Sequence, residues 1–124
     1  MGHYTSIRGW LDYPEELFGE IESLIESFVE RCAELDVSKE RAELYQEGWS
    51  FPKGQVNWTA YLFYGGDVRS YHENFIMEQL KSIASMRGSD GDHPKGRFDV
   101  ADDELRESVW SFADGVFREE VSGV

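Results

Sequence analysis

Apolar side chains in residues 17–35 recur every three or four positions, which is the spacing of one face of an α-helix. Pro14 suits a first helical turn, where its missing N–H costs nothing, and Asp12 and Glu15 have the spacing of a capping box. We therefore expect a helix from about Pro14 to Asp36. Its buried stripe consists of Leu17, Ile21, Leu24, Ile25, Phe28, Cys32 and Leu35.

The same spacing returns in residues 71–86, preceded by Ser70 and Glu73 at the spacing of another capping box. The glycines at residues 65–66 are expected to end the strand before this second helix, and residues 87–96 are expected to form a flexible loop after it. The side chains expected to be buried are Phe75, Ile76, Leu80, Ile83 and Ala84.

Aromatic and β-branched side chains at alternating positions predict strands in the remaining segments. In residues 56–64 large apolar groups occupy both faces, which suggests a central strand covered at least in part on both sides. Asp114-Gly115 is a two-residue hairpin signal between the last two strands. The six strands are expected at residues 3–11, 43–51, 56–64, 97–101, 107–113 and 116–121.

These elements follow one another in the order β-α-β-β-α-β-β-β. The chain has 124 residues and contains neither an internal repeat nor a linker, so we expect a single domain over residues 1–124. Two helices packed on a mostly antiparallel sheet, an α+β fold, is the arrangement that buries both helical stripes.

Charge is where the composition departs from that of an ordinary small domain. The formal net charge is −13, of which residues 1–62 carry −7 and residues 63–124 carry −6. A folded domain with this field repels nucleic acid and anionic lipid and attracts basic proteins and cations, although negative charge also favours solubility. No segment reads as a signal peptide or a membrane span, so we expect a cytoplasmic protein with neither nucleic acid nor membrane as its partner.

The sequence contains few residues that are arranged for catalysis or metal binding. Cys32 is the only cysteine and lies on the apolar stripe, where it is best interpreted as a small buried hydrophobe. The histidines His3, His72 and His93 lack the spacing that brings two imidazoles to one metal. Asp90 and the acids after it do not follow the pattern of a calcium-binding loop, and no nucleophile elbow or phosphate-binding glycine loop is present. We expect neither an enzyme nor a cofactor.

Two acidic clusters are candidates for partner binding. On the first helix, carboxylates follow one another at i,i+4 spacing, where like charges repel by a few tenths of a kcal/mol per pair, and only one base lies among residues 15–36. These carboxylates are Glu22, Glu26, Glu30 and Glu34. The second cluster, Asp102, Asp103 and Glu104, falls in a predicted turn that Asp90 and Asp92 could extend. The alternative for both is a solvated surface whose repulsion is screened by salt.

Four tryptophans fall on predicted strands, where such large side chains either fill the core or line a ligand pocket. They are Trp10, Trp49, Trp58 and Trp110. Tyr61 and Phe63 lie on the strand face opposite Trp58 and Leu62. They are either covered by a helix or available to a partner.

Three stretches together resemble a known family: "YTSIRGWL" at residues 4–11, "EGWSFP" at 47–52 and "NWTAYLFYGGDVR" at 57–69. They are similar to small bacterial immunity proteins encoded beside polymorphic or contact-dependent growth-inhibition toxins, over about residues 4–113. The shared residues are fold-defining aromatics and glycines, so no catalytic residue is carried over. The resemblance implies a cytosolic protein that binds and neutralises a cognate toxin domain, often a nuclease.

The sequence therefore supports two principal functions from different classes. The first is an immunity protein whose acidic surface complements a basic toxin domain, with either acidic cluster as the contact. The second is a small-ligand-binding or sensor domain with an aromatic-lined pocket bounded by Trp58, Tyr61 or Trp110. A small hydrolase or transferase is a third reading, and it requires a carboxylate or histidine with a strongly shifted pKa in a cleft.

Overall fold

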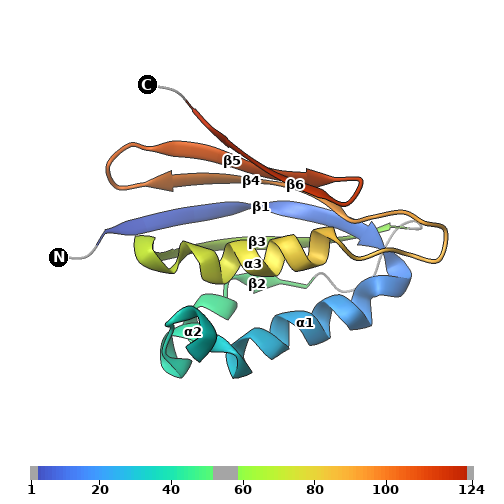
Figure 1. The fold of residues 1–124 in the computed structure, drawn as a ribbon, viewed down its shortest axis with the longest axis horizontal. Helices are drawn as coiled ribbons and strands as arrows, with labels where there is room; N and C mark the ends of the chain where they lie inside the picture. The colour runs from blue at the N-terminus through green and yellow to red at the C-terminus, as the bar shows by residue number, and fades with distance from the viewer. Residues whose placement is uncertain (1–2, 52–58, 123–124) are drawn as a thin grey trace.

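A computed structural model describes residues 3–51 and 59–122. One antiparallel sheet has the strand order β2-β3-β1-β4-β5-β6, and Figure 1 shows the helices grouped together beside it. The strands are β1 (Tyr4–Pro14), β2 (Trp49–Ser50), β3 (Thr59–Arg69), β4 (Lys95–Asp102), β5 (Glu107–Ala113) and β6 (Val116–Val121). The α-helices are α1 (Phe18–Glu30), α2 (Lys39–Gln46) and α3 (Glu73–Ala84), with short 3₁₀ turns at Glu15–Leu17, Cys32–Leu35 and Ser70–His72. The predicted α+β class is confirmed, with one helix more than expected.

The two faces of the sheet differ in how they are covered. In β1 the buried side chains Ile7 and Leu11 alternate with exposed Arg8 and Trp10, which is the period of two that a sheet covered on one face produces. The neighbouring strands repeat this alternation in register with β1. All the helices therefore cover one face, and the other face is open to solvent.

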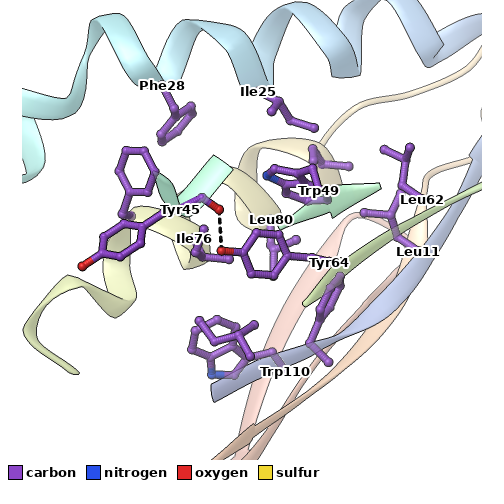
Figure 2. Close-up of a cluster of buried hydrophobic side chains, with 14 of the residues drawn as sticks. Leu11, Ile25, Phe28, Tyr45, Trp49, Leu62, Tyr64, Ile76, Leu80 and Trp110 are labelled. Atoms are coloured by element: carbon purple, nitrogen blue, oxygen red, sulfur yellow. Dashed lines mark hydrogen bonds between the residues drawn. The ribbon is translucent and has the colours of Figure 1, made fainter. Parts of the chain in front are cut away.

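The core lies between the sheet and the helices, where aromatic and aliphatic side chains from both layers meet (Figure 2). The α3 residues expected to be buried, Phe75, Ile76, Leu80, Ile83 and Ala84, are all buried. Trp110 is fully buried, and Phe75 packs edge-to-face on Phe28 of α1 with ring centroids 6.0 Å apart. Cys32 is buried in the same hydrophobic core, as its place on the apolar stripe predicted.

The first helix is shorter than its apolar stripe predicted. Asp12 and Pro14 belong to β1, where they pair with Tyr61 and Thr59 of β3, so the expected capping box does not form. At the other end α1 stops at Glu30, and the chain continues through a 3₁₀ turn to Asp36 in the left-handed conformation (φ 58°). This tight reversal turns Cys32 and Val37 toward the core and brings α2 back against α1.

The strand predicted over residues 43–51 is wrong. Residues 39–46 form α2, whose N-cap Ser38 accepts a hydrogen bond from the Arg41 N–H (3.3 Å), and only Trp49–Ser50 pair as a strand. Ala42 and Tyr45, three residues apart, are its buried positions. A single helical turn of apolar spacing is too short to distinguish from strand alternation in the sequence.

The glycines at residues 65–66 do not end β3. The strand continues to Arg69 because β1 extends beside it, with Gly66 opposite Ile7, and because the Gly65 N–H donates to the Gly48 carbonyl (3.1 Å). The second expected capping box is also absent, since α3 begins at Glu73 after a 3₁₀ turn. The Ser70 hydroxyl and the Glu73 carboxylate instead bind the buried Thr5 hydroxyl, at 2.9 and 3.0 Å.

The predicted hairpin at Asp114-Gly115 is confirmed. Both residues have positive φ (52° and 81°), and β5 and β6 pair on either side of them with Ala113 opposite Val116. This is the combination that a two-residue hairpin turn of this type requires.

Buried and half-buried polar side chains join the helices to one another and to the sheet. The Gln46 amide donates to the Ile25 carbonyl of α1 (2.7 Å) and exchanges hydrogen bonds with Gln79 of α3 (2.8 and 3.0 Å). Tyr45 lies against His72 and β3: its hydroxyl is 2.7 Å from His72 Nδ1, and the Tyr64 hydroxyl donates to its carbonyl at 2.7 Å (Figure 2). These bonds determine where α2 sits on the molecule.

The pH dependence of stability is expected to report on His72. Burial lowers the pKa of this imidazole below its ordinary 6.5, so the unfolded chain binds the proton more readily than the folded one. The free energy of unfolding should therefore fall as the pH drops below about 6.5, and this loss should end below the folded-state pKa.

Urea unfolding of the wild type and of His72→Gln, each at about pH 7.5 and about pH 5, measures this contribution. The difference between the two proteins isolates His72 from the carboxylates that also titrate in this range. If both proteins lose the same stability over this range, the neutral imidazole does not contribute to the pH dependence.

Candidate functional site

Charge is distributed unevenly between the two layers of the molecule, although the two halves of the sequence are equally acidic. Residues 15–47, which form α1, α2 and the turns around them, contain eleven Asp and Glu against three Lys and Arg. Strands β1, β3 and β4 each contain equal numbers of acids and bases. We call residues 15–47 the acidic helical layer, because most of the net charge of −13 belongs to it.

Within this layer, the first predicted cluster keeps three of its four members on one helix. Glu22, Glu26 and Glu30 follow at i,i+4 along α1, with Glu26 and Glu30 exposed and Glu22 half-buried. Glu34 lies in the 3₁₀ turn beyond the helix and pairs with Arg31 at 3.4 Å. Among the described residues, the three α1 carboxylates have no ion-pair partner, so none of those residues relieves their repulsion.

The second predicted cluster occupies the β4–β5 turn, as expected, but its members differ in role. One carboxylate oxygen of Asp102 accepts the backbone N–H groups of Glu104 and Arg106, each at 2.9 Å, and so holds the turn together. Asp103 and Glu104 lie 3.1 and 3.7 Å from His3 Nδ1, and the hydrogen bond to Asp103 raises the pKa of His3. This cluster is therefore partly neutralised by its own chain, whereas Glu22, Glu26 and Glu30 have no ion-pair partner among the described residues.

Asp90 and Asp92 do not extend this turn, contrary to the sequence-based suggestion. They lie at the other end of β4, where they line a cleft of about 770 Å³ together with carboxylates from residues 12–16 and from Asp114. The cleft acids are Asp12, Glu15, Glu16, Asp90, Asp92 and Asp114, and His93 and Lys95 also line it. Burial raises the pKa of Asp12, an effect that Lys95 opposes. No local pattern predicted this cleft, since tertiary folding alone brings its walls together.

The histidines make hydrogen bonds within the fold. His3 contacts Asp103, His72 contacts Tyr45, and His93 Nδ1 lies 2.7 Å from the Met86 carbonyl. In the part of the chain that the structure describes, no three His, Cys, Asp or Glu side chains are grouped so that they could hold a metal ion.

The tryptophans divide between the core and the open face. Trp49 and Trp110 are buried, Trp10 is exposed, and Trp58 lies outside the described residues. Tyr61 is on the open face and Trp110 on the covered one, so these two side chains cannot bound a single pocket. This arrangement counts against an aromatic-lined ligand site built from them.

Comparison of this chain with protein-family models, curated proteins and solved structures finds no match. Within residues 3–51 and 59–122, none of the helices has the length and apolar character needed to cross a membrane.

Proposed function

We propose that this protein is a cytoplasmic bacterial immunity protein that binds a cognate toxin domain, most simply a basic nuclease, and neutralises it through its acidic helical layer. The observation that carries this proposal is the concentration of eleven acids against three bases in residues 15–47, including three α1 carboxylates without a partner among the described residues. The resemblance of residues 4–11, 47–52 and 57–69 to such proteins supports the same class.

A nuclease must present a basic surface to its substrate. An enzyme that holds a phosphate backbone needs a cluster of Lys and Arg in its substrate cleft. A dense negative surface is complementary to that cleft, steers the two proteins together and can raise the association rate by orders of magnitude. Carboxylates that repel one another in the free inhibitor gain cationic neighbours in the complex, so binding removes an unfavourable interaction as well as adding favourable ones.

Neutralisation then requires no catalysis by the inhibitor. Carboxylates placed on the toxin's phosphate-binding side chains occupy the position of the substrate, and the inhibitor needs no cofactor. The same field repels nucleic acid and anionic membranes, so neither competes for the surface. The cleft between the start of β4 and residues 12–16 supports this reading, because a pocket lined by six carboxylates fits a Lys or Arg side chain from the toxin.

A growth experiment tests the proposal. The toxin domain encoded by the gene immediately upstream is expressed in the cytoplasm of a sensitive bacterium, with and without this protein. Protection by the wild type, together with a stable complex of the two purified proteins, is the expected result. Full toxicity in its presence, or a neighbouring gene that encodes a metabolic enzyme, would contradict the proposal.

A further inference from the structure

The face of the sheet opposite the helices has an exposed aromatic centre. Trp10, Tyr61 and Phe63 are 39%, 49% and 45% exposed. Trp10 on β1 stands directly opposite Phe63 on β3, and its ring packs edge-on against that of Tyr61 with centroids 6.4 Å apart. The sequence left open whether Tyr61 and Phe63 are covered by a helix, and in the structure they are not.

The charges around these aromatics are balanced. Among the described residues, the outward positions of the five longer strands carry five bases and five acids, and two base–acid pairs face one another across neighbouring strands. Arg8 stands opposite Asp99, and Asp12 stands opposite Lys95. The bases are Arg8, Arg69, Lys95, Arg97 and Arg118, and the acids are Asp12, Asp67, Asp99, Glu107 and Glu120. We call this surface the open sheet face.

We propose that two copies of this protein associate through their open sheet faces, in a twofold dimer centred on Trp10 and Phe63. Charge complementarity selects a second copy as the occupant. A chain of net charge −13 repels its own copy over most orientations, most strongly with the acidic helical layers facing each other. On the open sheet face bases and acids are equal in number, so a copy related by a twofold axis meets no net charge there and can place bases against acids.

The composition of this face also suits a protein interface. Trp, Tyr and Arg are the residue types that contribute most to binding at interfaces, particularly when neighbouring side chains exclude water from them. Trp10 and Tyr61 have Arg8 and Arg97 beside them on the same face, and Arg97 stands opposite Trp10 in the sheet. In a twofold contact each such residue acts twice, which doubles the effect of a small patch.

The area is sufficient for a dimer of modest affinity. Each strand residue covers roughly 16 Å², given ~3.4 Å along the strand and ~4.8 Å between strands, so the five longer strands present roughly 700 Å². A stable interface buries about 800 Å² on each partner, and sheets packed face to face separate by about 10 Å. The area of the open sheet face approaches the area of a stable interface only if most of the face is buried in the contact. This limit favours a dimer that dissociates readily.

This dimer goes beyond the proposed function and does not depend on it. The acidic helical layer lies on the opposite side of the sheet, so both copies would keep it free for a toxin (Figure 1). The two associations should also respond to salt in opposite directions. Salt screens the repulsion between two acidic copies and strengthens the dimer, whereas it weakens attraction between an acidic inhibitor and a basic toxin.

Sedimentation equilibrium of the purified chain, from about 1 µM to about 1 mM and in about 50 mM and about 500 mM NaCl, tests the proposal. The expected result is a monomer–dimer equilibrium that tightens at the higher salt. The double variant Trp10→Thr/Phe63→Thr keeps strand-favouring residues and should weaken the dimer at least tenfold. Leu44→Gln is the matched control, because it removes an exposed apolar side chain (59% exposed) from α2 and should leave the dimer unchanged.

Circular dichroism and urea midpoints establish that each variant folds. A wild type that remains monomeric at every concentration and both salts overturns the proposal, and so does a dimer that Leu44→Gln disrupts or that the double variant leaves intact. A monomer whose double variant loses toxin binding would assign the open sheet face to the toxin instead. Binding of a labelled single-stranded oligonucleotide by monomeric wild type, lost in the double variant, would assign the face to nucleic acid.

Discussion

Replacing Glu22, Glu26 and Glu30 together by lysine is expected to weaken binding of the cognate toxin domain about a hundredfold or more. Close charge pairs across an interface of this kind couple with energies of about 1.5–7 kcal/mol, and reversal replaces attraction by repulsion at three adjacent positions on α1. The expected loss should also flatten the dependence of affinity on salt, because fewer charge contacts remain to be screened. Calorimetric titration of the toxin domain over a series of NaCl concentrations measures both quantities.

A matched variant separates the contact surface from the overall field. Asp67, Glu107 and Glu120 are exposed on the other side of the sheet, and their replacement by lysine changes the net charge by the same amount. This control should slow association moderately and leave most of the affinity intact. Equal losses in the two triple variants would mean that net charge, and not α1, determines binding.

The rival acidic turn is tested in the same way with Asp103→Lys/Glu104→Lys. Asp102 is left in place, since its carboxylate accepts two backbone N–H groups and its loss would unfold the turn. If this variant loses more affinity than the α1 variant, the β4–β5 turn is the contact and α1 is a solvated surface.

Gly9→Ala is expected to destabilise the fold by about 3–5 kcal/mol, a large share of the total stability of a small domain. A Cβ at this position would fall on the carbonyl oxygen of Arg97 and lie 2.6 Å from Phe98 Cα, both on the neighbouring strand β4. Backbone atoms cannot rotate away as a flexible side chain can, so β1 and β4 would have to separate. Loss of this pairing would disrupt the centre of the sheet.

Gly65→Ala is the matched control, because a Cβ there meets nothing within 4 Å. It also replaces a strand glycine by a residue that loses less conformational entropy on folding, so a neutral or slightly stabilising effect is expected. Urea unfolding followed by circular dichroism compares the two variants with the wild type. A Gly9→Ala protein as stable as Gly65→Ala would show that β1 and β4 tolerate a wider spacing.

The elements that could be predicted are those whose sequence pattern involves only residues close together in the chain. The stripe over α3 and the hairpin at Asp114-Gly115 were both anticipated, since the first repeats over several turns and the second needs only two residues of defined chemistry. The eight-residue α2 was mistaken for a strand, and Gly65 was mistaken for a strand end. Hydrogen bonds between distant parts of the chain decided both outcomes. The Tyr64 hydroxyl donates to the Tyr45 carbonyl of α2, and the Gly65 N–H donates to the Gly48 carbonyl.

The candidate site follows the same rule, because only its locally clustered residues could be predicted from the sequence. Spacing along the chain identified the α1 carboxylates and the acidic β4–β5 turn, because each cluster is contiguous or helical in sequence. The cleft that joins Asp12 and Glu16 to Asp92 and Asp114 had no sequence signal, since its walls are up to 102 residues apart in the chain.

The sequence by itself determined the α+β class, the buried face of α3 and an excess of carboxylates, because periodicity and charge are properties of neighbouring residues. Only the tertiary structure decided which face of the sheet the helices cover, and with it the separation of an acidic helical layer from a balanced open sheet face bearing Trp10, Tyr61 and Phe63. The reason is that long-range strand pairing and the packing of α1, α2 and α3 bring together residues that are far apart in the chain. Their separation in the sequence does not indicate their distance in space.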